Sequence, residues 1–471
     1  MEVKRLSAVK QRCKYVACDY ATGVVAFFLF NILRCLLLHK GIDVVTFIFQ
    51  QKLMIEALTV PLGMLGIYWL SGYYNLPFGK SRLQELITTF FSSLINTGLI
   101  YFVLLINDQT GERLLNYELL GGLELLMFIV PYLGRFVVTS EATKHFRAHL
   151  WEFRTLIVGS SAAARETARR LSNGNTRAWV RIVGFLSIPG EENHADSDDV
   201  FPFEEIEALC RKEKIDQIVI AGSSYDEEKI LHMLYKLYLL GIPVKIAPDT
   251  FSYVTSAIRL QDIYGEPYVD LTSPALSESA KNVKRLADVI FSALILVIFS
   301  PFYLILALLV KLDSNGSVIY SQERIGRMQR PFKIYKFRTM RSDAEASGPQ
   351  LSEENDPRVT RVGKVLRKYR LDELPQFWNV LKGEMSIVGP RPERRYFIER
   401  IMRSAPYHAL VYQVRPGITS WGMVKYGYAS TVEQMVERTR YDLIYISNMS
   451  LYVDLKILIY TIKTVITGKG L

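Results

Sequence analysis

Residues 289–310 read VIFSALILVIFSPFYLILALLV, an apolar run long enough to cross a bilayer as a helix. Ser300 and Pro301 lie at its centre. A proline at this position removes a helix hydrogen bond and breaks the helix. Basic residues flank the run, with Lys281 before it and Lys311 after it. The sequence therefore favours two helices joined by a break over one straight span.

The positive charge of the chain lies around and behind this run. Residues 281–471 hold 30 Lys and Arg against 17 Asp and Glu, a net charge of +13, whereas the whole chain carries +10. A full crossing would move this basic region out of the cytoplasm, against the positive-inside tendency. We therefore expect a re-entrant membrane helix, with a proline-kinked span as the alternative. A basic region at a membrane favours phosphorylated substrates or anionic lipids over nucleic acid, since no nucleic-acid motif accompanies it.

Four earlier apolar windows of about 20 residues predict transmembrane helices. They are Tyr15–Leu38, Leu53–Tyr73, Leu86–Ile106 and Leu119–Thr139. Asp19, Asn31 and Arg34 in the first window are costly in lipid, so they should face other helices or the interface. The distribution of Lys and Arg in the loops places both ends of this region in the cytoplasm. The 4 cysteines show neither metal-ligand spacing nor a disulfide framework.

Residues 152–250 alternate strand and helix patterns, which predicts a parallel, doubly wound α/β sheet. The strands are expected at Thr155–Gly159, Arg181–Leu186, Gln217–Ala221 and Val244–Ile246, and later helices at Phe203–Lys214 and Glu227–Leu240. The first turn resembles a dinucleotide-binding turn, but only Gly159 of the G-x-G-x-x-G glycines is present. We expect a degenerate Rossmann-like domain with a structural or regulatory role, and nucleotide binding is the alternative.

Asp372 and Glu373 are adjacent carboxylates in a part of the chain rich in arginine, with Arg358, Arg361, Arg367 and Arg370 before them and Arg391 after them. Such a pair can be merely the acidic first turn of a helix, which the helix dipole favours. Here the surrounding Lys and Arg residues favour the ionised forms of both groups. An ionised, partly desolvated carboxylate can attack phosphorus or hold a divalent metal, so we favour a functional role for this pair.

Two further segments supply candidate phosphate ligands. Pro331–Met340 predicts a strand in which Lys336 and Arg338 share one face. A Lys and an Arg side by side can clamp a phosphate, although charges on a solvated strand edge are the alternative. Val388–Pro392 predicts a rigid turn that presents Arg391. At the C-terminal end, an apolar helical stripe over residues 451–466 suits a membrane interface or a core.

The order of these motifs resembles the bacterial sugar transferase family, the polyprenol-phosphate sugar-1-phosphate transferases. The resemblance covers residues 281–471 and rests on four motifs: Ser300-Pro301, Lys336–Met340, Leu371–Gln376 with Trp378-Asn379, and Gly389–Pro392. The N-terminal half resembles the large members, such as the undecaprenyl-phosphate galactose or glucose phosphotransferases. The domains are then a four-helix transmembrane region (1–150), a Rossmann-like cytoplasmic domain (151–250), a connector (251–280) and a catalytic module (281–471).

The resemblance implies transfer of a sugar-1-phosphate from a UDP-sugar to undecaprenyl phosphate, with release of UMP. It implies a covalent phosphosugar intermediate on Asp372, and Mg²⁺ held with the help of Glu373. Lys336, Arg338 and Arg391 would neutralise the phosphates. Such a protein would lie in the bacterial inner (cytoplasmic) membrane, with its catalytic module on the cytoplasmic side. It would initiate an exopolysaccharide, capsule or other glycoconjugate. The oligomeric state, a homodimer included, stays open.

One stretch departs from the family pattern. After Thr419 many members read Gly-Trp/Leu-Ala-Gln-Val-Asn-Gly-Arg, whereas this chain reads Ser420-Trp421-Gly422-Met423, then Val-Lys-Tyr-Gly. If this stretch contacts the donor, the identity of the sugar cannot be transferred from a relative. The alternative function, a membrane-anchored NAD-dependent nucleotide-sugar dehydratase, requires an intact glycine fingerprint, followed by a Tyr-x-x-x-Lys pair placed in a suitable α/β frame. Neither is found. A non-catalytic assembly platform would not need the carboxylate pair.

Overall fold

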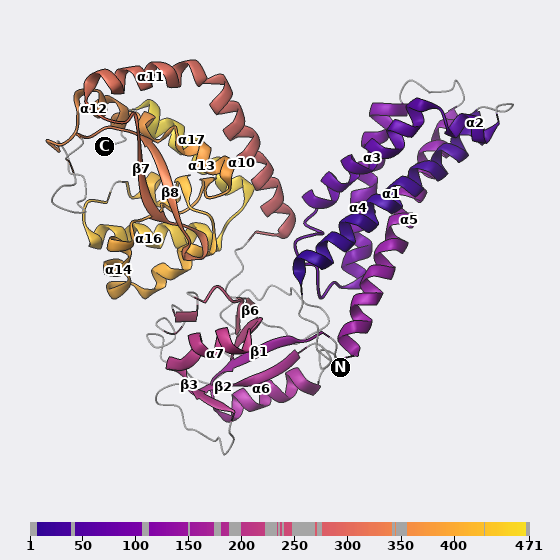
Figure 1. Ribbon diagram of the computed structural model, residues 1–471, viewed down its shortest axis with the longest axis horizontal. Helices are drawn as coiled ribbons and strands as arrows, with labels where there is room; N and C mark the ends of the chain where they lie inside the picture. Colours follow the sequence, from indigo (N-terminus) through magenta and orange to yellow (C-terminus); the bar gives the residue numbers. More distant parts are fainter. Residues whose placement is uncertain are drawn as a thin grey trace.

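The computed structural model describes residues 7–38, 43–105, 113–148, 151–173, 180–187, 199–221, 233, 236–237, 240–246, 269–270, 276–341, 344, 356–427 and 429–467. Figure 1 shows three bodies: a bundle of long helices, an α/β body built on a sheet, and a second α/β body. The helices α10 and α11 run along the edge of the second α/β body.

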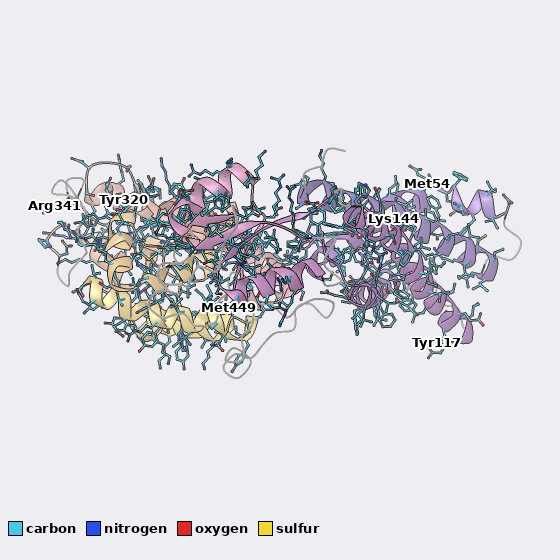
Figure 2. The ribbon with its side chains drawn as sticks, turned by 90° about the horizontal axis from the view of Figure 1, so that it is seen from below. Met54, Tyr117, Lys144, Tyr320, Arg341 and Met449 are labelled. Carbon is cyan, nitrogen blue, oxygen red and sulfur yellow. The ribbon has the colours of Figure 1, made fainter. Side chains whose placement is uncertain are left out.

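The bundle consists of four long helices and one short one. They are α1 (Ala8–Leu38), α2 (Val44–Ile48), α3 (Gln51–Leu70), α4 (Arg82–Ile100) and α5 (Arg113–Arg147), and the π-helical turn η1 (Tyr101–Leu105) extends α4. The four long helices have the length and hydropathy needed to cross a membrane. The four predicted spans are therefore confirmed, and the protein is a membrane protein. In Figure 2 these helices lie together at one end of the molecule, around Met54 and Lys144.

Buried charges inside the bundle compensate one another. The guanidinium of Arg135 donates to both carboxylate oxygens of Asp19, at 2.8 Å each, and the Tyr74 hydroxyl donates to Asp19 at 2.7 Å. Asn31 Nδ2 donates to the carbonyl oxygen of Phe27. An ion pair with these additional bonds offsets the cost of removing two charges from water. The expectation that these residues face other helices is confirmed for Asp19 and for Arg34, which lies over the ring of Phe47 in α2, and Asn31 is buried at 2% exposed.

The first α/β body contains a six-stranded sheet of order β3-β2-β1-β4-β5-β6. Its strands are β1 (Phe153–Val158), β2 (Val180–Ser187), β3 (Val200–Pro202), β4 (Gln217–Ile220), β5 (Val244–Ile246) and β6 (Val269–Asp270), and all pairs are parallel except β5 with β6. Its helical segments include α6 (Ala162–Asn173), η3 (Phe203–Glu205) and α7 (Ile206–Glu213). The central strands are apolar along their length because both faces of a parallel sheet are covered.

The four strands predicted from the sequence are all present. Two further strands, β3 and β6, were not predicted, because segments of three and two residues are too short to show an alternating pattern. The second of these, Val269–Asp270, falls within the predicted connector and pairs antiparallel with β5. The helix predicted over Glu227–Leu240 lies largely outside the described residues.

The apolar run over residues 289–310 lies in two helices, α10 (Glu278–Ile298) and α11 (Ser300–Asp313). They meet at an angle of 64°. Pro301 lies in the first turn of α11, where its missing N–H removes no helix hydrogen bond. The predicted break at Ser300 and Pro301 is therefore confirmed.

The second α/β body follows α11. It begins with the antiparallel pair β7 (Ile319–Ile325) and β8 (Pro331–Phe337), with the short helix η4 (Arg327–Gln329) between them. The elements after β8 are, in order, α12 (Arg361–Lys368), η5 (Leu371–Glu373), α13 (Gln376–Lys382), β9 (Ser386–Val388), α14 (Arg395–Ser404), η6 (Pro406–Gln413), β10 (Gly417–Thr419), α15 (Trp421–Lys425), α16 (Val432–Ser447) and α17 (Leu451–Ile466). Strands β9 and β10 pair in parallel. In Figure 2, Tyr320 and Arg341 of this body lie at the end of the molecule opposite to Met54.

Candidate active site

The carboxylate pair lies in a tight helical turn between α12 and α13. Arg370 adopts a left-handed conformation (φ 53°), which ends α12 sharply and starts the one-turn helix η5. Asp372 and Glu373 occupy this turn and are buried, with exposed fractions of 8% and 7%. A left-handed non-glycine residue is strained, and such strain commonly occurs at functional sites.

Glu373 is held by three cations. Lys336 Nζ lies 2.9 Å and Arg391 Nη1 3.3 Å from its Oε1, and Arg370 Nη1 lies 3.5 Å from its Oε2. Burial alone would raise the pKa of Glu373, but the charges of Lys336, Arg391 and Arg370 outweigh burial and hold the pKa below its usual range. Glu373 is therefore the anionic centre on which these cations converge.

Asp372 is in a different position although it is the next residue. Its Oδ2 lies 3.8 Å from Lys336 Nζ, a longer contact than those of Glu373. Burial raises the pKa of Asp372 above its ordinary value, and the neighbouring charge of Glu373 also raises it, while Lys336, Arg367 and Arg370 oppose the shift. Two adjacent carboxyl groups with opposed shifts suit different chemical roles. The expectation that the surrounding cations favour the ionised form therefore holds for Glu373, whereas burial outweighs the cations at Asp372.

Strand β8 brings Lys336 to this pair. Phe332 and Ile334 precede Lys336 on the same face of the strand and are buried in the core against α13. Asn379 of α13 fixes the backbone of β8, since its Nδ2 donates to the carbonyl oxygen of Lys333 at 2.7 Å and its Oδ1 accepts from the Tyr335 N–H at 3.2 Å. Asn379 of the Trp-Asn motif therefore fixes the strand that carries the lysine.

Strand β9 and the turn after it bring Arg391 to the pair from the other side. A Cβ at Gly389 would lie 2.3 Å from the carbonyl oxygen of Arg415, so only glycine permits this close approach. The turn then directs Arg391 so that Nη1 reaches both Glu373 and, at 3.5 Å, the sulfur of Met423 on α15. The stretch that departs from the family pattern thus contacts a residue of the candidate site.

Arg338 does not join this cluster, so the predicted pairing of Lys336 with Arg338 in one clamp is not observed. Strand β8 ends at Phe337, and the guanidinium of Arg338 turns towards the end of α11. It donates to the carbonyl oxygens of Val310 and Ser314, at 3.3 and 2.5 Å, and also to that of Ser317. Carbonyl groups at a helix end require donors, so Arg338 closes the connection between α11 and β7.

Helix α11 attaches the carboxylate turn to the apolar helix pair. The hydroxyl of Tyr303 donates to the carbonyl oxygen of Leu374 at 2.9 Å. Leu306 and Val310 of α11 belong to a buried cluster against which Leu371 and Leu374 pack. The two leucines on either side of the carboxylates therefore anchor the turn on α11. Ser300 and Pro301 lie at the start of α11, where the helix bends by 64° away from α10.

Two further residues act on the carboxylate pair and a third, Gln376, follows it closely in the sequence; none was assigned a role from the sequence. Arg370 contacts Glu373 directly, and the charge of Arg367 acts on Asp372 while its Nε donates to Thr339. Gln376 is 2% exposed, and its Nε2 has no hydrogen-bond partner among the residues that the structure describes. A buried amide donor without an acceptor is costly and is compatible with a substrate that supplies one. The sequence places these three residues within a few positions of the carboxylate pair, but it does not predict which groups they contact.

The donors present fit a magnesium ion completed by a substrate. Within the described part of the chain, no group of three or more His, Cys, Asp or Glu side chains is placed so that it could hold a metal ion by itself. Mg²⁺ commonly uses one or two protein carboxylates, with substrate phosphates and water as the other ligands. Asp372 and Glu373 supply two adjacent carboxylates, although a metal on Glu373 would compete with the cations that hold it.

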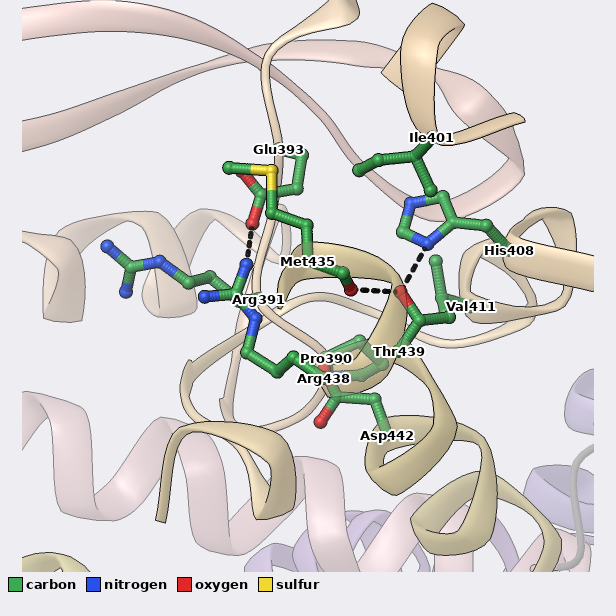
Figure 3. A pocket seen from close by; sticks show the side chains of 10 residues that line it. All are labelled: Pro390, Arg391, Glu393, Ile401, His408, Val411, Met435, Arg438, Thr439 and Asp442. Carbon is green, nitrogen blue, oxygen red and sulfur yellow. Dashed lines mark hydrogen bonds and ion pairs between the residues drawn. The ribbon is translucent and has the colours of Figure 1, made fainter. Parts of the chain in front are cut away.

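A small cavity lies behind the Arg391 turn, between η6 and α16 (Figure 3). It has room for about one water molecule. His408 lines it, and burial lowers the pKa of this imidazole to about 4. Arg438 and Glu393 form a buried ion pair at 2.5 Å on its opposite wall. The cavity is too small for a sugar nucleotide, so we do not assign it as the substrate site. The residues that line it pack against the Arg391 turn.

The sequence pattern of the family described as bacterial sugar transferase matches residues 279–468, which include every candidate site residue. Among solved structures, the crystal structure of a UDP-D-quinovosamine 4-dehydrogenase from Vibrio fischeri matches 25% of this chain and 93% of that chain, with 16% identity and a TM-score of 0.21. A likeness at this level carries no conclusion about fold or activity.

Curated relatives match longer parts of this chain than the family pattern does. A UDP-N-acetylgalactosamine-undecaprenyl-phosphate N-acetylgalactosaminephosphotransferase from Aeromonas hydrophila is 46% identical over 237 residues, 50% of this chain and 55% of that protein. The chain thus spans about half the length of that relative. A UDP-glucose:undecaprenyl-phosphate glucose-1-phosphate transferase from Escherichia coli (strain K12) is 33% identical over 318 residues, 67% of this chain and 68% of that protein. These relatives are transferases and do not favour the dehydratase alternative. The chain belongs to the bacterial sugar transferase family.

Proposed function

We propose that this protein transfers a sugar-1-phosphate from a UDP-sugar to undecaprenyl phosphate, releases UMP, and so initiates the assembly of a polysaccharide or other glycoconjugate. The observation that carries the proposal is the arrangement of the carboxylate pair. Glu373 binds three cations, while Asp372 lies at their edge with one longer contact to Lys336. A nucleophile next to a cluster of cations suits attack on a phosphate, because the cations offset the repulsion between like charges.

In the first step, a carboxylate oxygen of Asp372 attacks the β-phosphorus of the UDP-sugar. The bond from this phosphorus to the oxygen that bridges the two phosphates breaks, and UMP leaves with the electron pair. The sugar-phosphate is then attached to Asp372 as an acyl phosphate. Lys336, which contacts Asp372, and Arg391, which contacts the adjacent Glu373, would bind the non-bridging oxygens, whose charge increases in the transition state.

In the second step, a phosphate oxygen of undecaprenyl phosphate attacks the same phosphorus. The bond to Asp372 breaks and the carboxylate is restored, so a single phosphate site serves both bulky substrates in turn. Mg²⁺ held with the help of Glu373 would neutralise phosphate charge in both steps. Arg370 keeps Glu373 oriented during both steps.

We further propose that α10 and α11 form a re-entrant membrane helix, with the catalytic module (281–471) on the cytoplasmic side of the bacterial inner membrane. The 64° bend and the basic charge of the module support this arrangement. Residues 1–150 would anchor the chain. Residues 151–250 would form a degenerate Rossmann-like domain, and residues 251–280 would connect it to the catalytic module.

The donor sugar is a separate part of the proposal. The two relatives named above carry N-acetylgalactosamine and glucose in their names, and the former is the more identical over its matched region. We therefore propose UDP-N-acetylgalactosamine and UDP-glucose as the first donors to test, and the divergent stretch from Ser420 to Met423 is the reason to measure the sugar rather than to carry it over from a relative. UMP release from a panel of UDP-sugars, with undecaprenyl phosphate and Mg²⁺, measures both the reaction and its sugar preference. No release with any donor would refute the proposed function.

The covalent step is tested without the lipid acceptor. Wild-type protein with UDP-sugar and Mg²⁺ should gain the mass of the sugar-phosphate, with the adduct on Asp372. Asp372→Asn keeps the shape of the side chain and removes its charge, so both adduct and turnover should be lost. Glu373→Gln is the matched variant and should chiefly impair metal-dependent turnover. An adduct on Glu373 would exchange the two roles, and ternary-complex kinetics without an adduct would indicate direct transfer.

A further inference from the structure

We propose that Asp442 is the positioning residue of Arg391, since it binds the backbone of the Arg391 turn and the start of α15 together. This inference rests on the proposed function, in which Arg391 binds the transferred phosphate. It goes beyond that function because it assigns a role to a residue of α16 that makes no contact with the carboxylate pair itself among the described contacts.

Asp442 is a buried carboxylate that accepts hydrogen bonds from three directions. The N–H of Gly422 donates to its Oδ1 at 2.9 Å, and the Ser420 side chain and the Arg391 backbone donate to it as well. It is 4% exposed, and burial raises its pKa to about 6 although these bonds and Arg438 oppose the shift. Figure 3 shows Asp442 and Arg438 extending from one helix towards Pro390 and Arg391.

The donors come from two segments that follow paired strands. Arg391 follows β9 and Gly422 follows β10, and the strands themselves pair only over short stretches, Gly417 with Ser386 and Thr419 with Val388. Beyond these pairs, the N–H of Gly389 still donates to the carbonyl oxygen of Thr419 at 3.0 Å, and the N–H of Gly417 donates to that of Pro390 at 2.9 Å. Asp442 adds a further connection between the two segments, at Arg391 and at Gly422.

Close packing supports the same role. A Cβ at Gly422 would lie 2.8 Å from Asp442 Oδ1 and 2.7 Å from Arg438 Cγ, so the start of α15 lies directly against α16. Ser420 both caps α15, by accepting from the Met423 N–H at 3.0 Å, and donates to Asp442. Met423 in turn contacts the Arg391 guanidinium. Asp442 thus fixes Arg391 in two ways: it binds the backbone of Arg391, and it holds the start of α15, where Met423 contacts the Arg391 guanidinium.

Misplacing a phosphate ligand by about 1 Å can reduce a rate by about 100-fold. Asp442→Asn replaces one acceptor oxygen by an NH₂ group that faces donors, while the side chain keeps its shape. We expect kcat for UMP release to fall between about 10- and 100-fold, with KM for the UDP-sugar changing much less. Glu437→Gln is the matched control, because Glu437 lies on the same helix but is exposed and paired with Arg440.

A double-mutant cycle separates positioning from an independent effect. If Asp442 acts through Arg391, the variant with both Asp442→Asn and Arg391→Ala should be about as slow as Arg391→Ala alone. Multiplied effects of the two substitutions would overturn the inference. Asp442→Ser, which keeps one acceptor in a smaller side chain, serves if the asparagine variant does not give a cooperative melt.

Hydrogen exchange decides the structural part without relying on activity. Arg391 lies between Pro390 and Pro392, so the backbone N–H of this tripeptide belongs to Arg391. Its exchange should accelerate at least 10-fold in Asp442→Asn and not in Glu437→Gln. Unchanged exchange would refute the anchor even if the enzyme were slower. If wild type released no UMP from any donor, the proposed function would fail, while faster exchange would still support the anchoring of the turn by Asp442.

Discussion

At the scale of single residues, the site separates two basic side chains that the sequence presents as equivalent. Lys336 and Arg338 alternate correctly along one strand, but β8 ends between them and only Lys336 reaches the carboxylate pair. Arg338 closes the end of α11 instead. The alternation of the strand predicted that both basic residues lie on one face. The end of the strand at Phe337 determines that only Lys336 contacts Glu373.

This difference leads to a test with Arg391 and Arg338. Arg391→Ala removes a proposed phosphate ligand, so UMP release should fall by about 100-fold with little loss of thermal stability. Arg338→Ala leaves several carbonyl groups without a buried donor, which should cost about 1–3 kcal/mol of stability, while folded protein keeps most of its activity. Rates per folded molecule and melting temperatures of both variants are the measurements. A rate loss in Arg338→Ala as large as in Arg391→Ala would return Arg338 to the phosphate site.

At the scale of elements, long apolar patterns were predictable and short tertiary segments were not. The four membrane helices and the break at Ser300 follow from apolar length and from one proline, and both are confirmed. Helix α17 also begins at Leu451 and ends at Ile466, as predicted. Strands β9 and β10 have three residues each, and they exist because Gly389 and Gly417 allow two backbones to approach closely. Such contacts connect distant parts of the chain and leave no periodic signal.

The helix pair α10–α11 carries the element-scale prediction. If the 64° bend returns the chain to one side, residues before α10 and after α11 must share a compartment. Cysteines placed at Ser277 and Asn315, in a chain without its native cysteines, should both react with a membrane-impermeant thiol reagent only when the cytoplasmic face is accessible. Reaction from opposite faces would show a kinked span and refute the re-entrant arrangement.

At the scale of the whole molecule, α10 is shared between two bodies. On one side Asn282 Nδ2 donates to the carbonyl oxygen of Trp69 at 2.5 Å, and Asn75 donates to Glu278 at 2.6 Å. On the other side Lys284 pairs with Asp454 of α17 at 2.6 Å and also donates to the carbonyl oxygen of Val388. The first set joins α10 to the bundle. The second set joins it to the strand that precedes the Arg391 turn.

These two sets of contacts allow anchoring and chemistry to be separated in the intact chain. All the proposed catalytic residues follow Lys281, so we expect residues 1–250 to be dispensable for the reaction. Asn282→Ala removes a buried hydrogen bond to the bundle, which should cost about 1–3 kcal/mol of stability and leave kcat for UMP release within about twofold of wild type. Lys284→Ala is the matched variant on the same helix. It leaves Asp454 buried without its cation and loosens the backbone at Val388, so it should lower both stability and kcat. If Asn282→Ala instead slows the reaction as much as Lys284→Ala, the bundle takes part in positioning the site, and residues 1–250 are not dispensable for the chemistry.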